Sequence, residues 1–262
     1  MIRQPWVYGV AAASTIFFGG TVALRSALGI RWFQGFAERA TGNWARVILW
    51  GARVRVTVED PERLGEGGGQ ILVSNHQSWF DVFSLAAALP VRFSFVGKKE
   101  LNRIPFLGHA WEKVGHVAID RRDHQSALNS LGSLDGQIRD EGRTIIMFPE
   151  GTRSPTGELR RFKKGAFVMA IKAQVPVVPV ALAGTRRVME KGDWRISPGH
   201  VTVRVGEPIP TAGLTLRDRD RLSAQVREAV LALRDAGGGT RSEAADGRPA
   251  STSATARLER TA

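Results

Sequence analysis

The sequence predicts an α/β fold, with a mixed, mainly parallel sheet flanked by helices and an N-terminal two-helix membrane-associating element. Three observations predict it. Short apolar runs of strand character alternate with segments of helical spacing over residues 70–234. Long apolar stretches occupy residues 4–51. Basic loops, several containing glycine, follow the predicted strands. These features together indicate one large α/β domain with appendages.

The first apolar segment is just long enough to cross a bilayer. No charged residue occurs from Gln4 to Leu24, and about 20 apolar residues span the hydrocarbon core. A signal peptide is an alternative interpretation, because Ala11 to Ala13 are small enough for cleavage. Against that interpretation, apolar residues continue beyond them, and the basic residue before them is Arg3 alone.

A second N-terminal segment, residues 29–51, mixes tryptophans with arginines. That mixture suits an amphipathic helix in the headgroup layer of a membrane. Arginine is denser after the first segment than before it, so the positive-inside bias favours a cytoplasmic location for the remainder. We therefore predict a protein that is anchored in the inner membrane or lies deeply in one leaflet, with its remaining domain on the cytoplasmic face. A soluble protein with two buried helices is the alternative.

The remaining chain alternates predicted strands and helices. The strands are Gln70–Val73, Arg92–Val96, Val117–Ile119, Thr144–Phe148, Val177–Ala183 and Val201–Val205. The helices are Trp79–Leu89, Gln125–Arg139, Ala166–Ala173 and Arg217–Arg234. Pro176 and Pro179 indicate an edge strand or a strand end. We divide the chain into N-terminal helices at 1–55, an α/β domain at 56–235, and a disordered tail at 236–262 that almost lacks large apolar residues.

Composition narrows the classes of function. The chain of 262 residues has no cysteine, which excludes disulfides, cysteine-ligated zinc and thiol catalysis. Its net charge of +12 implies an anionic partner, such as nucleic acid, an anionic membrane surface or phosphorylated substrates. No nucleic-acid-binding motif is visible and only one tyrosine is present, so we predict no nucleic-acid partner and an anionic membrane surface instead.

The loop after the first predicted strand places His76 five residues before Asp81. Histidine is the side chain whose charge changes nearest neutral pH, and a carboxylate can fix its tautomer. Ser78 is a suitable N-cap for the following helix, and Asp81 then completes a capping box. If His76 precedes the helix, the carboxylate points back toward it. From these residues alone, catalysis and simple helix capping are equally supported.

Basic residues recur in four loops at the ends of predicted elements. These are Lys98 and Lys99, Arg121 and Arg122, Arg153, and Lys163 with Lys164. One such loop is more simply explained as a solvated face, but four beside the histidine loop suggest a phosphate-bearing substrate. Arg153 is the best phosphate ligand among them, because a guanidinium matches phosphate geometry in a bidentate manner.

The chain resembles the glycerolipid acyltransferases, specifically the 1-acyl-sn-glycerol-3-phosphate (lysophosphatidic acid) acyltransferases. Four blocks carry the resemblance in the family's order. They are Asn75–Asp81, similar to N-H-x-x-x-x-D; Gly115–Arg121, similar to G-x-x-x-I-D-R; Phe148–Ser154, matching F-P-E-G-T-R-S; and the proline-containing Val175–Ala181. With the N-terminal helices, the resemblance covers residues 1–210.

The resemblance implies a reaction of phospholipid biosynthesis. His76 would act as general base on the sn-2 hydroxyl of lysophosphatidic acid, and Asp81 would orient its ring. The alkoxide would attack the thioester of acyl-CoA or acyl carrier protein, giving phosphatidic acid without a covalent enzyme intermediate, a metal or a cofactor. The substrate-binding residues implied by the family's motifs are Arg121, Glu150, Gly151, Thr152 and Arg153. Lys98 and Lys99, from the basic loop outside these motifs, would assist them.

Two other functions fit the same residues. The acceptor could be another lysolipid, such as lyso-ornithine lipid, or the protein could bind lipids without catalysis. For single residues, Glu150 could cap a helix or pair with Arg153. The other four histidines lack a carboxylate at this spacing, and we interpret them as structural or surface residues.

Overall fold

The structure is a computed structural model that describes residues 3–30, 33–65, 68–120, 132 and 134–236. Its helices are α1 (Arg3–Ala27), α2 (Phe33–Ala52), α3 (Phe80–Ala88), α4 (Leu107–Lys113), α6 (Asp135–Arg139), α7 (Gly165–Ala173), α8 (Thr185–Val188) and α9 (Arg219–Asp235). Its strands are β1 (Val54–Glu59), β2 (Gln70–Ser74), β3 (Phe93–Lys98), β4 (Val117–Ile119), β5 (Thr144–Met147), β6 (Val177–Ala183) and β7 (Gly199–Val205).

One seven-stranded sheet organises the molecule, in the order β1-β7-β6-β2-β5-β3-β4. Strands β6, β2, β5, β3 and β4 run parallel to one another, and β1 is parallel to β7. The pairing of β6 with β7 is antiparallel. The predicted mixed, mainly parallel α/β sheet is therefore confirmed. Because β2, β5 and β6 run in the same direction, their carboxyl ends meet at one edge, where open α/β sheets bind ligands.

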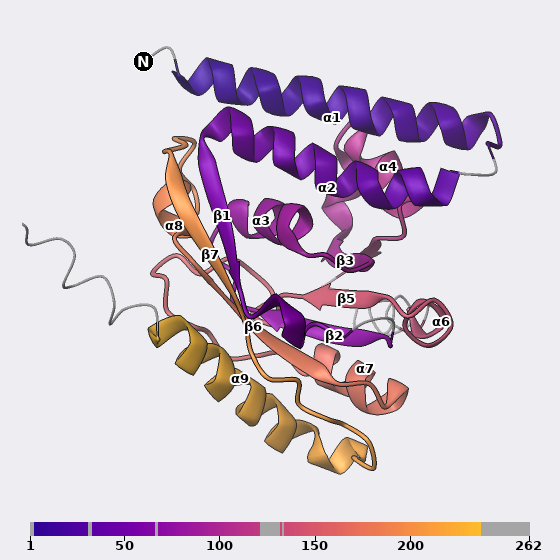
Figure 1. Ribbon diagram of the computed structural model, residues 1–262, viewed down its shortest axis with the longest axis vertical. Helices are drawn as coiled ribbons and strands as arrows, with labels where there is room; N and C mark the ends of the chain where they lie inside the picture. Colours follow the sequence, from indigo (N-terminus) through magenta and orange to yellow (C-terminus); the bar gives the residue numbers. More distant parts are fainter. Residues whose placement is uncertain (1–2, 31–32, 66–67, 121–131, 133, 237–262) are drawn as a thin grey trace, which may run out of the picture.

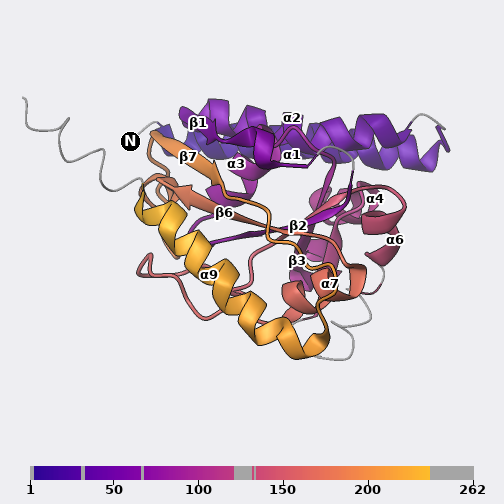
Figure 2. The same cartoon turned by 60° about the horizontal axis from the view of Figure 1, so that its bottom comes forward.

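Helices cover both faces of the sheet (Figures 1 and 2). On one face, α2 and α3 enclose a core that includes Leu49, Leu72 and Phe80. On the other face, α7 and α9 enclose a second core that includes Ile71 and Phe167. Neighbouring residues of β2 thus enter different cores, as the alternation of side chains along a buried strand requires.

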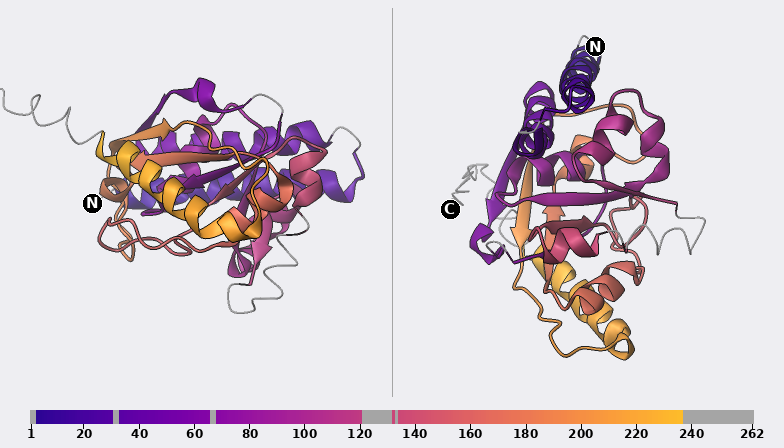
Figure 3. Two further views of the ribbon diagram at one scale, coloured as in Figure 1. Left: turned by 90° about the horizontal axis from the view of Figure 1, so that it is seen from below. Right: turned by 90° about the vertical axis from the view of Figure 1, so that its right-hand side faces the viewer.

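The N-terminal helices α1 and α2 lie side by side on the face opposite α9 (Figures 1 and 3). From Gln4 to Ala27, α1 is long and apolar enough to cross a membrane, with a mean hydropathy of 1.6, and only 22% of its most apolar stretch is buried. Its outer surface and the end of α2 expose large apolar side chains, among them Trp6, Phe17 and Trp50. One side of α1 thus packs against the rest of the protein, and its other, apolar side is exposed.

Several boundaries differ from the predictions. Strand β1 was not predicted, although Val54 to Glu59 alternate apolar and polar residues, and neither were the short helices α4 and α8. The predicted domain boundary at 55/56 stays a prediction, and β1 runs across it. The predicted tail, and most of the predicted helix Gln125–Arg139 before α6, lie outside the described residues.

The prediction from Pro179 needs correction. Pro176 does precede a strand, but Pro179 lies inside β6, a central strand. The carbonyl of Pro179 accepts the N–H of Gly206 at 2.8 Å, so its own nitrogen faces the same side. There the chain leaves β7 after Val205 and pairs with β6 again only at Ile209. The missing donor therefore falls in an interrupted part of the ladder, where proline costs little.

Candidate active site

The loop that follows β2 is fixed to both neighbouring strand ends. The side chain of Asn75 accepts the N–H of Leu182 at 2.7 Å and donates to the carbonyl of the same residue at 2.9 Å. On the other side, the backbone of His76 donates to Glu150 Oε1 at 2.7 Å and accepts the N–H of Ser154 at 2.7 Å. These bonds tie the β2 loop to β6 and to the loop after β5, and so hold His76 in one position.

His76 and Asp81 form the predicted pair. The distance from His76 Nδ1 to Asp81 Oδ2 is 2.8 Å, and the Asp81 side chain is fully buried. The same Oδ2 accepts the backbone N–H groups of Gln77 at 2.6 Å and Ser78 at 2.8 Å. Three donors converge on one oxygen at the start of a helix, where the dipole also favours a negative charge. Capping and orientation of the histidine are therefore the work of the same carboxylate.

The helix start differs slightly from the prediction. Helix α3 begins at Phe80, one residue later than predicted, and its N-cap residue is Trp79. Ser78 still serves the helix start, because its hydroxyl accepts the N–H of Phe80 at 3.2 Å. That hydroxyl donates to the carbonyl of Met189 at 2.8 Å. Ser78 therefore also connects the helix start to the chain after α8.

The imidazole of His76 lies against an aromatic ring. Phe148, directly after β5, stacks on it with ring centroids 4.1 Å apart and planes 18° from parallel. The His76 side chain keeps 16% of its surface exposed. Because Nδ1 faces Asp81, Nε2 is the nitrogen that remains to receive a proton from a bound hydroxyl. Phe148 is not among the site residues predicted from the sequence, although it is the first residue of the Phe148–Ser154 motif.

Glu150 joins two loops rather than pairing with Arg153. Its Oε1 accepts the His76 N–H, and its Oε2 accepts the N–H of Arg160 at 3.1 Å. Burial raises the pKa of this carboxyl, opposed by the hydrogen bonds from the backbone of His76 and Arg160. Both carboxylate oxygens are thus engaged with backbone, which makes Glu150 a positioning residue for the histidine loop.

The next residues of the motif lie beside the pair. Gly151 has a φ of 72°, a left-handed backbone conformation that favours glycine. A Cβ there would lie 2.7 Å from Cε of Lys163, but the end of that flexible side chain could move aside. The guanidinium of Arg153 lies over the Trp79 ring, 5.2 Å from its centroid. Burial lowers the pKa of Arg153, opposed by the charge of Asp81. Thr152 lies between them, partly buried.

The predicted lysines lie farther along the same sheet edge. Lys98 pairs with Glu100 at 2.7 Å, and Lys99 lies 3.8 Å from Asp120. Strand β3 is separated from β2 by β5, which places its end roughly 10 Å from the end of β2. Arg121 lies outside the described residues. The structure therefore gathers His76 with Asp81, Glu150 and the 151–153 segment, but not the lysines.

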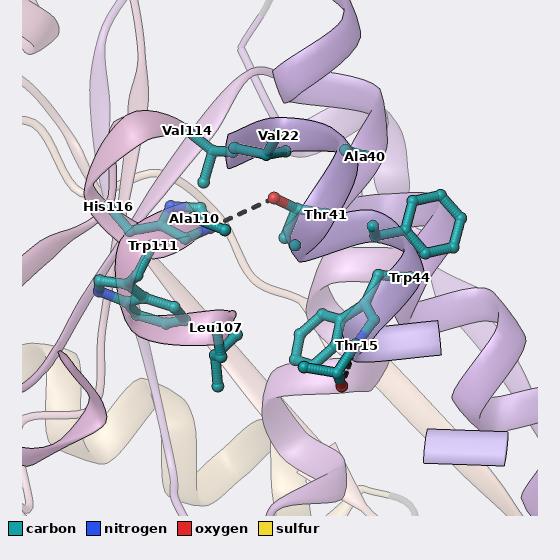
Figure 4. Close-up of a pocket in the computed structure, with 12 residues that line it drawn as sticks. Thr15, Val22, Ala40, Thr41, Trp44, Leu107, Ala110, Trp111, Val114 and His116 are labelled. Carbon is teal, nitrogen blue, oxygen red and sulfur yellow. Dashed lines mark hydrogen bonds between the residues drawn. The ribbon is translucent and has the colours of Figure 1, made fainter. Parts of the chain in front are cut away.

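A separate small cavity of about 40 Å³ lies between α1, α2 and α4 (Figure 4). His116 closes one wall, with Nε2 3.4 Å from the Thr41 hydroxyl and Nδ1 accepting the N–H of Phe95 at 3.3 Å. Burial lowers the pKa of His116 to about 3, and the charge of Arg143 acts in the same direction. This histidine is neutral at physiological pH and structural, as predicted.

The chain is similar to known proteins. Residues 55–183 match the sequence model of a family described as Acyltransferase, a range that includes His76, Asp81 and the 148–154 motif. The chain belongs to the acyltransferase family. The resemblance predicted from four motifs is therefore confirmed.

The relatives carry one recurring name. This acyltransferase is 38% identical over 177 residues to the human 1-acyl-sn-glycerol-3-phosphate acyltransferase beta, covering 68% of this chain and 64% of the relative. It is 33% identical over 170 residues to the 1-acyl-sn-glycerol-3-phosphate acyltransferase of Limnanthes alba, covering 65% and 60%. The matches thus span slightly less than two thirds of these relatives.

A solved structure matches nearly the whole chain. The 1-acyl-sn-glycerophosphate (LPA) acyltransferase PlsC from Thermotoga maritima has 28% sequence identity and a TM-score of 0.76, with 94% of this chain and 97% of that chain covered. The N-terminal helices therefore belong to the shared architecture, together with the sheet.

Proposed function

We propose that this protein transfers a fatty acyl group from a thioester donor to the sn-2 hydroxyl of 1-acyl-sn-glycerol 3-phosphate, giving phosphatidic acid. The observation that carries the proposal is the 2.8 Å contact from His76 Nδ1 to the buried Asp81 carboxylate, at the carboxyl edge of the sheet. The names of the relatives support the choice of substrate.

The chemistry needs only side chains of this chain and two substrates. Nε2 of His76 removes the proton of the acceptor hydroxyl as the oxygen attacks the thioester carbonyl, and Asp81 stabilises the imidazolium that forms. The tetrahedral intermediate collapses with cleavage of the carbon–sulfur bond, and the imidazolium returns its proton to the leaving thiolate. An ester forms, a thioester breaks, and no metal or cofactor takes part in these steps.

The position of Arg153 supports a phosphate-bearing acceptor. Its guanidinium, packed over Trp79 beside the dyad, offers a fork that suits a phosphate group. Lys98, Lys99 and Arg121 would extend this positive region along the sheet edge. The apolar outer side of α1 supports attachment to the membrane that supplies the lysolipid, with the α/β domain on the cytoplasmic face.

Purified protein in phospholipid vesicles, given lysophosphatidic acid and either acyl-CoA or acyl carrier protein, tests the proposal. Mass spectrometry should detect phosphatidic acid with at least one donor. His76→Ala should lower the rate by about two to four orders of magnitude, whereas His109→Ala, exposed on α4, should not change it. Absence of product with both donors, or full activity of His76→Ala, would refute the proposal.

The acceptor is tested by comparing kcat/KM for several lysolipids. The phosphate argument predicts that lysophosphatidic acid exceeds lyso-ornithine lipid, and that Arg153→Gln reduces this preference. A higher kcat/KM for lyso-ornithine lipid would make that lipid the acceptor. Binding of lysolipids without turnover would favour a non-catalytic lipid-binding protein.

A further inference from the structure

A cleft of about 590 Å³ opens directly beside the histidine loop. The lining residues that matter here are Gln77, Gly157, Arg186, Arg187, Glu190 and Arg234. Gln77 follows His76 in the chain, and its side-chain amide donates to the carbonyl of Gly157 at 3.2 Å. Consecutive Cα atoms are about 3.8 Å apart, so the cleft begins within one residue of the dyad. It is not the region of Arg153, which lies over Trp79.

The cleft draws arginines from two elements that are distant in sequence. Arg186 and Arg187 belong to α8, after the carboxyl end of β6, and Arg234 belongs to the last turn of α9. Arg234 Nη1 donates to the Gly157 carbonyl at 3.3 Å. The Arg186 side chain also passes close to Gly157, whose φ is 88° and whose hypothetical Cβ would lie 3.4 Å from Arg186 Cδ. Side chains from three separate segments, Gln77, Arg186 and Arg234, therefore meet at Gly157.

Carboxylates neutralise these arginines only in part. Arg186 Nη2 lies 3.5 Å from Glu190, both partly exposed, and Arg234 Nε lies 3.2 Å from Asp235. Within the described part of the chain, the exposed guanidinium of Arg187 has no side-chain partner. Glu158 also lines the cleft and is exposed. With Asp235 counted, three carboxylates stand against the three arginines. Because Arg187 has no carboxylate partner among the described residues, its guanidinium is the one ready for an anion.

We propose that this cleft binds the phosphates of the coenzyme A moiety of an acyl-CoA donor, an inference that rests on the proposed function. Coenzyme A carries a pyrophosphate and a 3′-phosphate at the end opposite its thioester. Arginine is the residue best suited to such groups. With the phosphates held by α8 and the end of α9, the pantetheine arm can lead past Gln77 and bring the thioester carbonyl to the His76 loop.

The shape of the site favours a small molecule over a carrier protein. Clefts of about 300–1,000 Å³ are typical of small-molecule sites, and the volume of about 590 Å³ falls within this range. Arg234 also ends α9, on the sheet face opposite α1 and α2 (Figures 1 and 3). Helix α8 packs against α3 on the same face as these helices, so the cleft lies at the carboxyl edge of the sheet between its two faces.

Kinetics with two acyl donors test the proposal. The first is acyl-CoA, and the second is the same acyl group on N-acetylcysteamine, which keeps the thioester and lacks every phosphate. The double variant Arg186→Gln/Arg187→Gln should lower kcat/KM for acyl-CoA about 100-fold, at about tenfold per lost charge-assisted contact. Its kcat/KM with the phosphate-free donor and its KM for lysophosphatidic acid should stay unchanged. Arg217→Gln is the matched control, an exposed arginine before the other end of α9, about 25 Å along the helix axis.

The outcomes separate this proposal from the proposed function. Equal effects of the double variant on both donors, or none on acyl-CoA, would overturn the cleft assignment. The assignment would also be overturned if the wild-type protein accepted acyl carrier protein as the acyl donor but not acyl-CoA. If the wild-type protein formed no phosphatidic acid with any donor, the proposed function would fail. Calorimetric titration with free coenzyme A would still decide the cleft, because wild-type binding that weakens about 100-fold in the double variant supports it. Equal Kd values, or no binding, refute it.

Discussion

Replacing Asp81 with asparagine isolates the charge of the dyad, because the surrounding backbone decides how the new side chain lies. The N–H groups of Gln77 and Ser78 both point at Oδ2, at 2.6 and 2.8 Å. An amide nitrogen there would face two donors, so the amide oxygen of asparagine must take this place. It can then still accept Nδ1–H of His76, and the histidine keeps its tautomer and position. What is lost is the negative charge.

The size of the effect follows from the 2.8 Å separation of Nδ1 and Oδ2. A full imidazolium–carboxylate attraction at this distance is worth about 6 kcal/mol at an effective dielectric constant of 20 and about 1.5 kcal/mol in bulk water. Asp81 is buried while His76 is partly exposed, and the neutral hydrogen bond remains. We therefore expect a loss of about 3–4 kcal/mol in the transition state, which lowers kcat by two to three orders of magnitude.

The decisive assay compares Asp81→Asn, His76→Ala and the double variant in the phosphatidic acid assay. If Asp81 acts only through His76, the double variant should be no slower than His76→Ala. A further hundredfold loss in the double variant would show that Asp81 contributes by another route. A kcat for Asp81→Asn within tenfold of wild type would show that its charge does not stabilise the transition state. In each variant, unfolding by urea monitors stability, and Asp81→Asn should lose about 1–2 kcal/mol because its amide nitrogen falls where Oδ1 has no described partner.

Three further predictions concern the packing around the site. His116 has its pKa lowered to about 3 by burial, against about 6.5 when unfolded, so its stabilisation is present above pH 6.5 and is lost as pH falls toward 3. Because of this group, acidification from pH 7 to 4 should lower the free energy of unfolding by about 3 kcal/mol. The difference in unfolding free energy between these two pH values should therefore be smaller in His116→Asn than in the wild type, and unchanged in His109→Asn. Glu150→Gln should destabilise by about 1–3 kcal/mol and lower kcat, because only one of its two backbone donors keeps an acceptor; urea unfolding and the phosphatidic acid assay measure both, and wild-type values would contradict the positioning role. Asn75→Ala should cost about 3 kcal/mol in urea unfolding, because both backbone groups of Leu182 lose their buried partner; a loss below 0.5 kcal/mol would argue against that pairing.

The sequence by itself determined the α/β class, since strand and helix periodicities differ and are local properties. It also predicted that Asp81 could reach His76, because a carboxylate in the first turn of α3 points to the residues just before that turn, although it left capping and catalysis equally supported. Helix geometry over a few residues is enough to make that prediction. The apolar N-terminal helix can likewise be predicted from composition and length alone.

Only the tertiary structure decided which distant groups meet. The order of the strands joins β2 to β5 and β6, and from this order follow the stacking of Phe148 on His76 and the pairing of Asn75 with Leu182. The same order brings Arg186 to the cleft that Arg234 also lines. No local periodicity encodes strand order, because it depends on how whole faces of helices and sheet bury one another. The prediction from Pro179 was wrong for this reason. The backbone N–H that proline lacks is tolerated only because the segment beside β6 leaves the ladder between Val205 and Ile209.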